Sequence, residues 1–156
     1  MDGKRLSRKL SALELVGPLI CISADQYNCS NRPVRIWVHN SGSVAVWRKG
    51  YSTRCRLCTT LVTAIGRVAA ATRCRVTIDK IRRCSNDGSI LADELSKGRF
   101  EAFKRKLPGS WEISLDPAWI PPSILAWIAD PKDDISLGDK ILADMHKRQT
   151  FLSINN

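Results

Sequence analysis

The sequence predicts an α/β fold, in which a small, partly parallel sheet is flanked by helices and followed by a helical C-terminal extension. Two short runs rich in β-branched residues, 34–38 (VRIWV) and 75–81 (RVTIDKI), predict strands. The stretch 55–74 between them predicts a long helix, because its apolar residues repeat at helical spacing. These residues are Leu57, Leu61, Ile65 and Val68. A strand, a long helix and a second strand predict a right-handed parallel crossover.

Further helices are expected on both sides of this unit. Residues 10–22 carry apolar residues at helical spacing, and Pro18 predicts that this helix is kinked or starts later than the pattern suggests. A short helix opens near Ser41, and residues 89–103 (SILADELSKGRFEAF) predict a helix after the second strand. The stretches 119–131 and 136–148 each predict a helix in the tail. The apolar residues expected to face the core from 10–22 are Leu10, Leu13, Val16 and Ile20.

Composition and charge limit the classes of protein to which this chain can belong. The chain has 156 residues, of which 44% are hydrophobic, and its net charge is +10. Residues 1–108 hold 21 basic and 8 acidic residues, which favours a polyanionic partner such as nucleic acid. No run of apolar residues is long enough to span a membrane, and Glu14 interrupts the one stretch that resembles a secretion signal. We therefore expect an intracellular protein, cytoplasmic or nuclear, with reduced cysteines.

Three residues are candidates for chemistry. Glu14 lies on the first predicted helix, His39 directly follows the first predicted strand, and Asp93 lies on the helix after the second strand. Carboxylates that converge from separate elements can hold divalent cations for phosphodiester hydrolysis. Spacing alone also fits solvent-exposed carboxylates on helix surfaces.

Five stretches together resemble a known family. They are SALELVGPL, VRIWVHN, GYSTRCRLCTTLVTAIGRVAA, RVTIDKIRRCS and ILADELSKGRF. They resemble the ribonuclease H domain attached to reverse transcriptases, most of all the version found in tyrosine-recombinase-type retrotransposons and related mobile elements of fungi and animals. The resemblance covers roughly residues 10–103. It implies a mixed five-stranded sheet flanked by helices, and cleavage of the RNA strand of an RNA–DNA hybrid by two Mg²⁺ or Mn²⁺ ions held by four carboxylates.

The resemblance assigns positions in the site. Glu14 in LELVG matches the family's helix glutamate, and Asp93 in LADELS matches its last aspartate, so both would be metal ligands. His39 in WVHN stands where the family has a strand-ending aspartate. The first aspartate would precede residue 1. The resemblance thus implies a truncated ribonuclease H-like fold that lacks its first three strands, and catalysis impaired at a site formed by Glu14, His39 and Asp93, since imidazole is a poor ligand for Mg²⁺.

Basic residues near the ends of the predicted strands and helices are the candidates for nucleic-acid contact. They are Arg48, Lys49, Arg54, Arg56, Arg73, Arg75, Lys80, Arg82 and Arg83. The two tryptophans of this part of the chain, Trp37 and Trp47, are expected in the core, because aromatic residues dominate core burial. The expected ligand is an RNA–DNA hybrid or RNA.

The chain is expected to divide into two parts. Residues 1–107 would form the ribonuclease H-like domain and 108–156 the extension. An unpaired edge of strand 34–38 would pair with the upstream polymerase portion or with a second copy of the chain.

Two alternatives to the ribonuclease H-like function remain open. One is a domesticated, non-enzymatic basic module that contacts nucleic acid or protein. The other is a small zinc protein that uses His39 with the Cys55-x-x-Cys58 pair.

Overall fold

The structure, a computed structural model, describes residues 3–82, 87–106 and 119–154. Within these ranges the elements follow one another in this order: α1 (Gly3–Ala24), α2 (Gln26–Cys29), β1 (Pro33–Val38), α3 (Ser41–Lys49), α4 (Arg56–Thr72), β2 (Arg75–Lys80), α5 (Asp87–Ser96), α6 (Phe100–Lys106), α7 (Pro122–Ala129) and α8 (Leu137–Ile154). The α/β class is therefore confirmed, in a mostly helical chain with a small parallel sheet.

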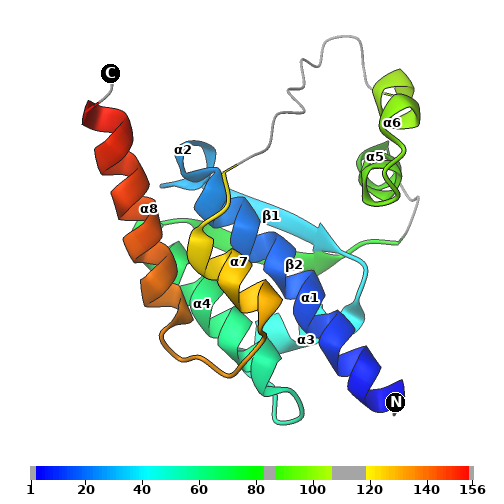
Figure 1. Ribbon diagram of the computed structural model, residues 1–156. Helices are drawn as coiled ribbons and strands as arrows, with labels where there is room; N and C mark the ends of the chain where they lie inside the picture. The colour runs from blue at the N-terminus through cyan, green and yellow to red at the C-terminus, as the bar shows by residue number, and fades with distance from the viewer. Residues whose placement is uncertain (1–2, 83–86, 107–118, 155–156) are drawn as a thin grey trace.

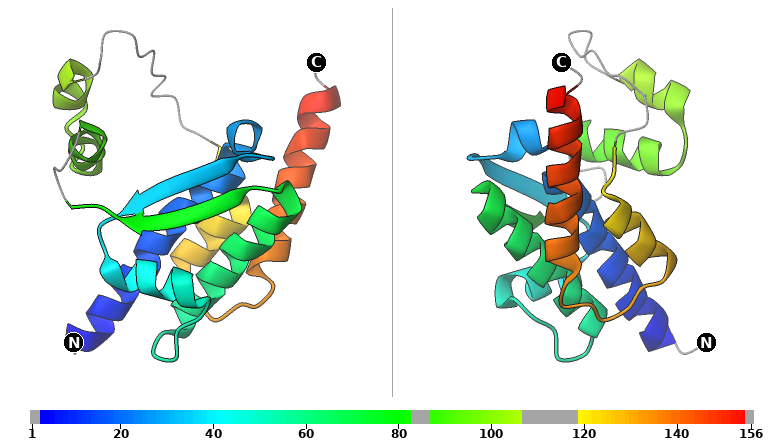
Figure 2. Two further views of the ribbon diagram at one scale, coloured as in Figure 1. Left: turned by 180° about the vertical axis from the view of Figure 1, so that it is seen from behind. Right: turned by 60° about the vertical axis from the view of Figure 1, so that its left-hand side comes forward.

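The sheet pairs β1 with β2 in parallel, in a register that joins Pro33 to Arg75 and Val38 to Lys80. Helices α1 and α4 cover one face of this sheet, and α7 and α8 lie on the far side of α1 and α4 (Figures 1 and 2). The other face of the sheet carries no helix of the described residues in these views. Since β1 pairs only with β2 among the described residues, its second edge has no strand beside it there.

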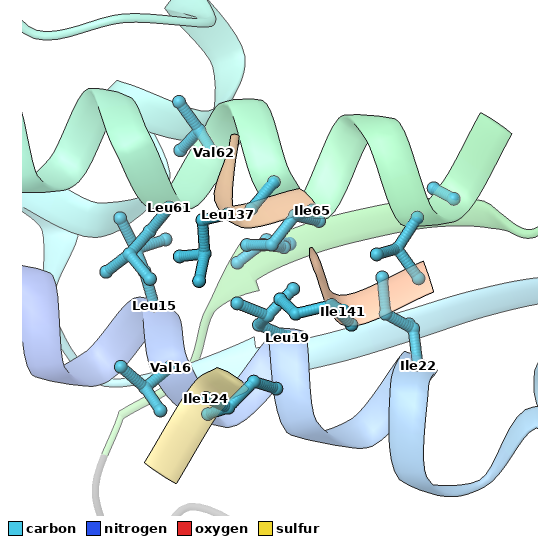
Figure 3. Close-up of a cluster of buried hydrophobic side chains, with 14 of the residues drawn as sticks. Leu15, Val16, Leu19, Ile22, Leu61, Val62, Ile65, Ile124, Leu137 and Ile141 are labelled. Carbon is cyan, nitrogen blue, oxygen red and sulfur yellow. The ribbon is translucent and has the colours of Figure 1, made fainter. Parts of the chain in front are cut away.

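The core lies between α1, α4 and the two C-terminal helices (Figure 3). The apolar stripe predicted on α4 is confirmed, because Leu61, Ile65 and Val68 are fully buried and Leu57 packs against the core from the side. Helix α8 contributes Ile141, which is also fully buried. The tail thus packs on the same core as the strands, while the expected boundary near residue 107 stays a prediction.

The predicted stripe on the first helix is partly wrong. Helix α1 runs unbroken through Pro18 and begins at Gly3, earlier than expected. Leu13 is 48% exposed, whereas Val16 is buried as predicted. The buried side of α1 consists of Ala12, Leu15, Val16, Leu19 and Ile22. The sequence offers apolar residues on two sides of this helix, and only contact with α4 selects between them.

The helix expected over 89–103 is two helices. Helix α5 ends at Ser96 and α6 begins at Phe100. Gly98 between them adopts a positive φ of 67°, a conformation that glycine takes at little cost and that ends a helix. The pair is called the α5–α6 hairpin below (residues 87–106). Leu91 and Phe103 are buried in it, apart from the main core.

No helix among the described residues is both long and apolar enough to cross a membrane.

Candidate functional site

The three predicted chemical residues line one hollow. Glu14 from α1, His39 after β1 and Asp93 from α5 border a cavity of about 330 Å³, together with the end of β1. Most of the remaining lining is apolar and includes Pro18 and Trp37. Residues separated widely in the sequence are therefore brought to one place, which spacing alone could not establish.

Glu14 holds the turn between β1 and α3. Its Oε2 accepts a hydrogen bond of 2.8 Å from the backbone N–H of Asn40. The Asn40 side chain caps α3, because its Oδ1 accepts from the N–H of Gly42 at 2.7 Å. Its Nδ2 donates to the Ser11 hydroxyl on α1 at 3.1 Å. One carboxylate oxygen of Glu14 is therefore engaged in joining α1 to the strand end.

His39 is fixed by the residue that follows β2. Its Nδ1 lies 3.2 Å from the carbonyl oxygen of Ile81. A carbonyl oxygen only accepts, so Nδ1 carries the proton and a neutral ring keeps its lone pair on Nε2. The ring is half-buried. His39 thus bridges the ends of the two strands and presents one nitrogen acceptor.

Asp93 is paired with Lys97, the residue that follows the end of its own helix. The Lys97 ammonium forms an i,i+4 ion pair with its carboxylate, whose side chain is 13% exposed. The Lys97 ammonium already neutralises the negative charge of the Asp93 carboxylate, which a metal ion would need. Within the described residues, no group of three or more His, Cys, Asp or Glu side chains is arranged to hold a metal ion.

The residues present do not fit the pair of Mg²⁺ or Mn²⁺ ions that the family resemblance implies. Such ions need several hard oxygen ligands free to coordinate. Here Glu14 accepts from the backbone of Asn40, Asp93 is paired with Lys97, and the third position offers an imidazole nitrogen in place of a carboxylate oxygen. These three residues therefore do not supply the ligand set of a two-metal site.

The cysteines considered for zinc serve the start of α4. The Cys55 sulfur accepts from the N–H of Cys58 at 3.4 Å and so caps this helix. Cys58 is buried, and burial raises the pKa of its thiol to about 12, with the neighbouring Cys55 adding to the effect. A thiol of such high pKa is a poor thiolate ligand at neutral pH.

A basic surface borders the hollow on the uncovered face of the sheet. Asp79 on β2 lies 3.0 Å from Arg48 on α3 and 3.6 Å from Arg35 on β1. The side chains of Arg48 and Arg35 are mostly exposed, at 68% and 64%. Because one carboxylate faces two arginines, the cluster keeps a positive charge. Arg75, at the start of β2, is also exposed.

Trp37 stands between this surface and the hollow, so the expectation that it is a core residue is wrong. It is 50% exposed and lines the hollow. The guanidinium carbon of Arg35 lies 5.6 Å from the centroid of its ring, which is cation–π distance. Arg35 was missing from the predicted contacts. The alternation in VRIWV carried the signal, because Val34, Ile36 and Val38 face the helices and leave Arg35 and Trp37 on the other face.

The other predicted basic residues do not form one surface. Arg56 lies 3.9 Å from Asp133, near the start of α4, and Arg54 is exposed in the loop before it. Arg73 lines a different hollow, between α2 and α8. Lys49 follows Arg48, Lys80 is the last residue of β2 and Arg82 lies beyond it; all three are exposed. Arg83 lies outside the described residues.

No family model, no curated protein and no solved structure matches the chain.

Proposed function

We propose that this chain is a ribonuclease H-like domain of retroelement type that contacts nucleic acid and whose two-metal cleavage is impaired. The observation that carries the proposal is the meeting of Glu14, His39 and Asp93 at one hollow beside an exposed arginine and tryptophan. These three positions are the ones that the family resemblance assigns to the site. A parallel strand pair joined by a long helix also suits the family's fold.

The ligand that suits the exposed face is RNA, alone or in an RNA–DNA hybrid. Arg35 and Arg48 supply charge for backbone phosphates, whose binding releases counterions. The half-exposed ring of Trp37 offers an aromatic surface on which a base can stack. The hollow beside the ring would then lie next to the bound strand.

Binding is tested by fluorescence anisotropy with a labelled RNA–DNA hybrid at two salt concentrations. Arg35→Gln and Trp37→Ala should each weaken binding about fivefold or more, since a phosphate contact or a stacked base is lost. Arg105→Gln on α6, which removes the same charge from another surface, is the control. Equal losses in Arg35→Gln and Arg105→Gln would contradict an interface on the sheet.

Cleavage is tested with the same hybrid in Mg²⁺ and in Mn²⁺. We expect no cleavage above background, because the ligands are engaged elsewhere. Turnover that Asp93→Asn abolishes would contradict the proposed impairment.

A non-enzymatic module that binds nucleic acid or protein is the second candidate. The Lys97–Asp93 pair favours it, because it neutralises a carboxylate that catalysis would require. The same two assays separate the candidates: salt-sensitive binding of all polyanions alike favours a general basic module, whereas preference for the hybrid favours the ribonuclease H-like domain.

The second edge of β1 gives a further contact. Unpaired strand edges accept strands from other chains, so we propose that a polymerase segment or a second copy pairs there. Light scattering at increasing protein concentration tests the second copy: a monomer at all concentrations would exclude it.

A further inference from the structure

A second, larger hollow lies at the other end of the sheet. Its volume is about 730 Å³, and it is bordered by the end of α1, by α2, by the end of α4 and by α8. It therefore lies beside the start of β1, whereas the hollow of Glu14 lies beside its end. Cavities of about 300–1,000 Å³ are typical of small-molecule sites.

Two arginines from different helices line this hollow. Arg73 follows α4, and Arg148 belongs to α8. Neither guanidinium has a carboxylate within 4.0 Å among the described residues. Arginines elsewhere in the structure, such as Arg48 and Arg67, do have such partners. The two charges at the hollow are thus available to an anion.

Arg148 is also held in position. Its guanidinium carbon lies 4.5 Å from the centroid of the Trp119 ring, which lines the same hollow. Stacking restrains the plane of the guanidinium but leaves its N–H groups, which lie in that plane, free to donate. A restrained planar donor set loses less entropy when it binds an oxyanion.

The remaining polar groups fit the same ligand. Ser30 also lines the hollow, and its buried hydroxyl oxygen has no hydrogen-bond partner among the described residues. Asp25 is the one carboxylate among the described lining residues, and its oxygens accept from the Asn28 amide at 3.0 and 3.1 Å. Two arginines against one engaged carboxylate leave the hollow positive.

We propose that this hollow binds phosphomonoesters of nucleotide size, with Arg148 and Arg73 on the phosphate. Tyr27, also in the lining, is 89% exposed and gives the organic part of the ligand an aromatic surface. This site is independent of the proposed nucleic-acid interface, because it lies at the opposite end of β1 and uses none of that interface's residues.

The test is isothermal titration calorimetry of the full chain with 5′-AMP, adenosine and inorganic phosphate. We expect saturable binding of 5′-AMP and at least about tenfold weaker binding of adenosine, because charge-assisted bonds to the phosphate are lost. Inorganic phosphate should compete with 5′-AMP. Adenosine binding as tightly as 5′-AMP, or no saturable binding of 5′-AMP at millimolar concentration, would overturn the proposal.

Two variants assign the site. Arg148→Gln should weaken 5′-AMP binding at least about tenfold. Lys147→Gln is the matched control, because it removes the same charge from the neighbouring residue of α8, which is exposed and does not line this hollow. Equal losses in the two variants would show binding by general charge and overturn the assignment. Circular dichroism of both variants establishes that they are folded.

Discussion

The body of the protein and the α5–α6 hairpin are stabilised in different ways. The body, formed by α1–α4, the two strands, α7 and α8, buries a continuous apolar core. The hairpin buries Leu91 and Phe103, and charged contacts join its two helices. Lys106 lies 2.7 Å from Glu94, and Arg99 lies 3.8 Å from the same carboxylate. Although Glu94 is buried, the side chains of Arg99 and Lys106 are about half exposed, and ion pairs with such exposed cations contribute little compared with apolar burial.

This difference matters for the candidate site. Glu14 and His39 belong to the body, whereas Asp93 belongs to the hairpin. The hollow that they share is therefore only as persistent as the weaker of the two regions. The hollow of Arg148, in contrast, is built from the body and the residues next to α7.

Truncation of a core leucine should have the largest effect. Leu61→Ala should lower the free energy of unfolding by about 2–5 kcal/mol, because the side chain is fully buried and leaves a cavity. Urea denaturation measures the change. Leu125→Ala, at a side chain that is 51% exposed on α7, is the matched control and should change it far less.

Addition of one methyl group at the start of α8 should have the next largest effect. In Gly138→Ala the new Cβ would lie 2.8 Å from Arg67 Cβ and 3.3 Å from Ala64 Cα, so α4 and α8 must separate at a cost of about 1–3 kcal/mol. Gly66→Ala on α4, where a Cβ meets nothing within 4 Å, should stabilise by about 0.5–1 kcal/mol. Destabilisation by both substitutions would contradict the close approach of α4 and α8.

Truncation within the hairpin should act locally. Phe103→Ala should open residues 87–106 but change the urea transition of the body by less than about 1 kcal/mol, since Phe103 does not belong to the main core. Amide hydrogen exchange distinguishes the regions. Faster exchange in α4 as well as in α5 would show that the two regions unfold together.

Acidification should also weaken the hairpin before the body. The hydrogen bond from Lys106 holds the pKa of Glu94 below its usual value near 4.5. A lowered pKa in the folded state stabilises above the unfolded-state pKa, and this stabilisation is lost as the pH falls through the folded-state pKa. We expect faster amide exchange in 87–106 below about pH 4.5.

Lys106→Gln supplies the control for this effect, because it removes the main cause of the shift. The pH dependence of exchange in the hairpin should then shrink. In the body, Lys140 and Ser136 lower the pKa of Asp134 to about 2, so the contact before α8 should persist until the pH falls towards 2. Loss of this contact near pH 4 would contradict the expectation.

The sequence predicted an element correctly where the spacing of its apolar residues indicated a single buried side. The strands and the stripe on α4 follow from periodicity, because most of their apolar residues lie on one side; Trp37, on the other face of β1, is the exception. Helix α1 has them on two sides, so its buried side was misassigned. Gly98 divided a helix because its backbone conformation, which the sequence does not specify, is left-handed.

The candidate site was predictable in part. Glu14, His39 and Asp93 were candidates from their places on the predicted elements, and the family resemblance assigned them to one site; no spacing argument could have brought α1, β1 and α5 to one hollow. Arg35 could have been found from strand alternation. The stack of Arg148 on Trp119 could not, because it joins residues of separate segments through tertiary packing.

The hydrogen bond between Glu14 and the backbone of Asn40 gives this carboxylate a structural role. This carboxylate holds the capped turn before α3 and so stabilises the turn independently of any reaction. The presence of a glutamate at this position is therefore not, by itself, a sign of an active enzyme. Asp93 is paired with Lys97, and Asp93→Asn would test chemistry without removing the hydrogen bond that Glu14 makes to this turn.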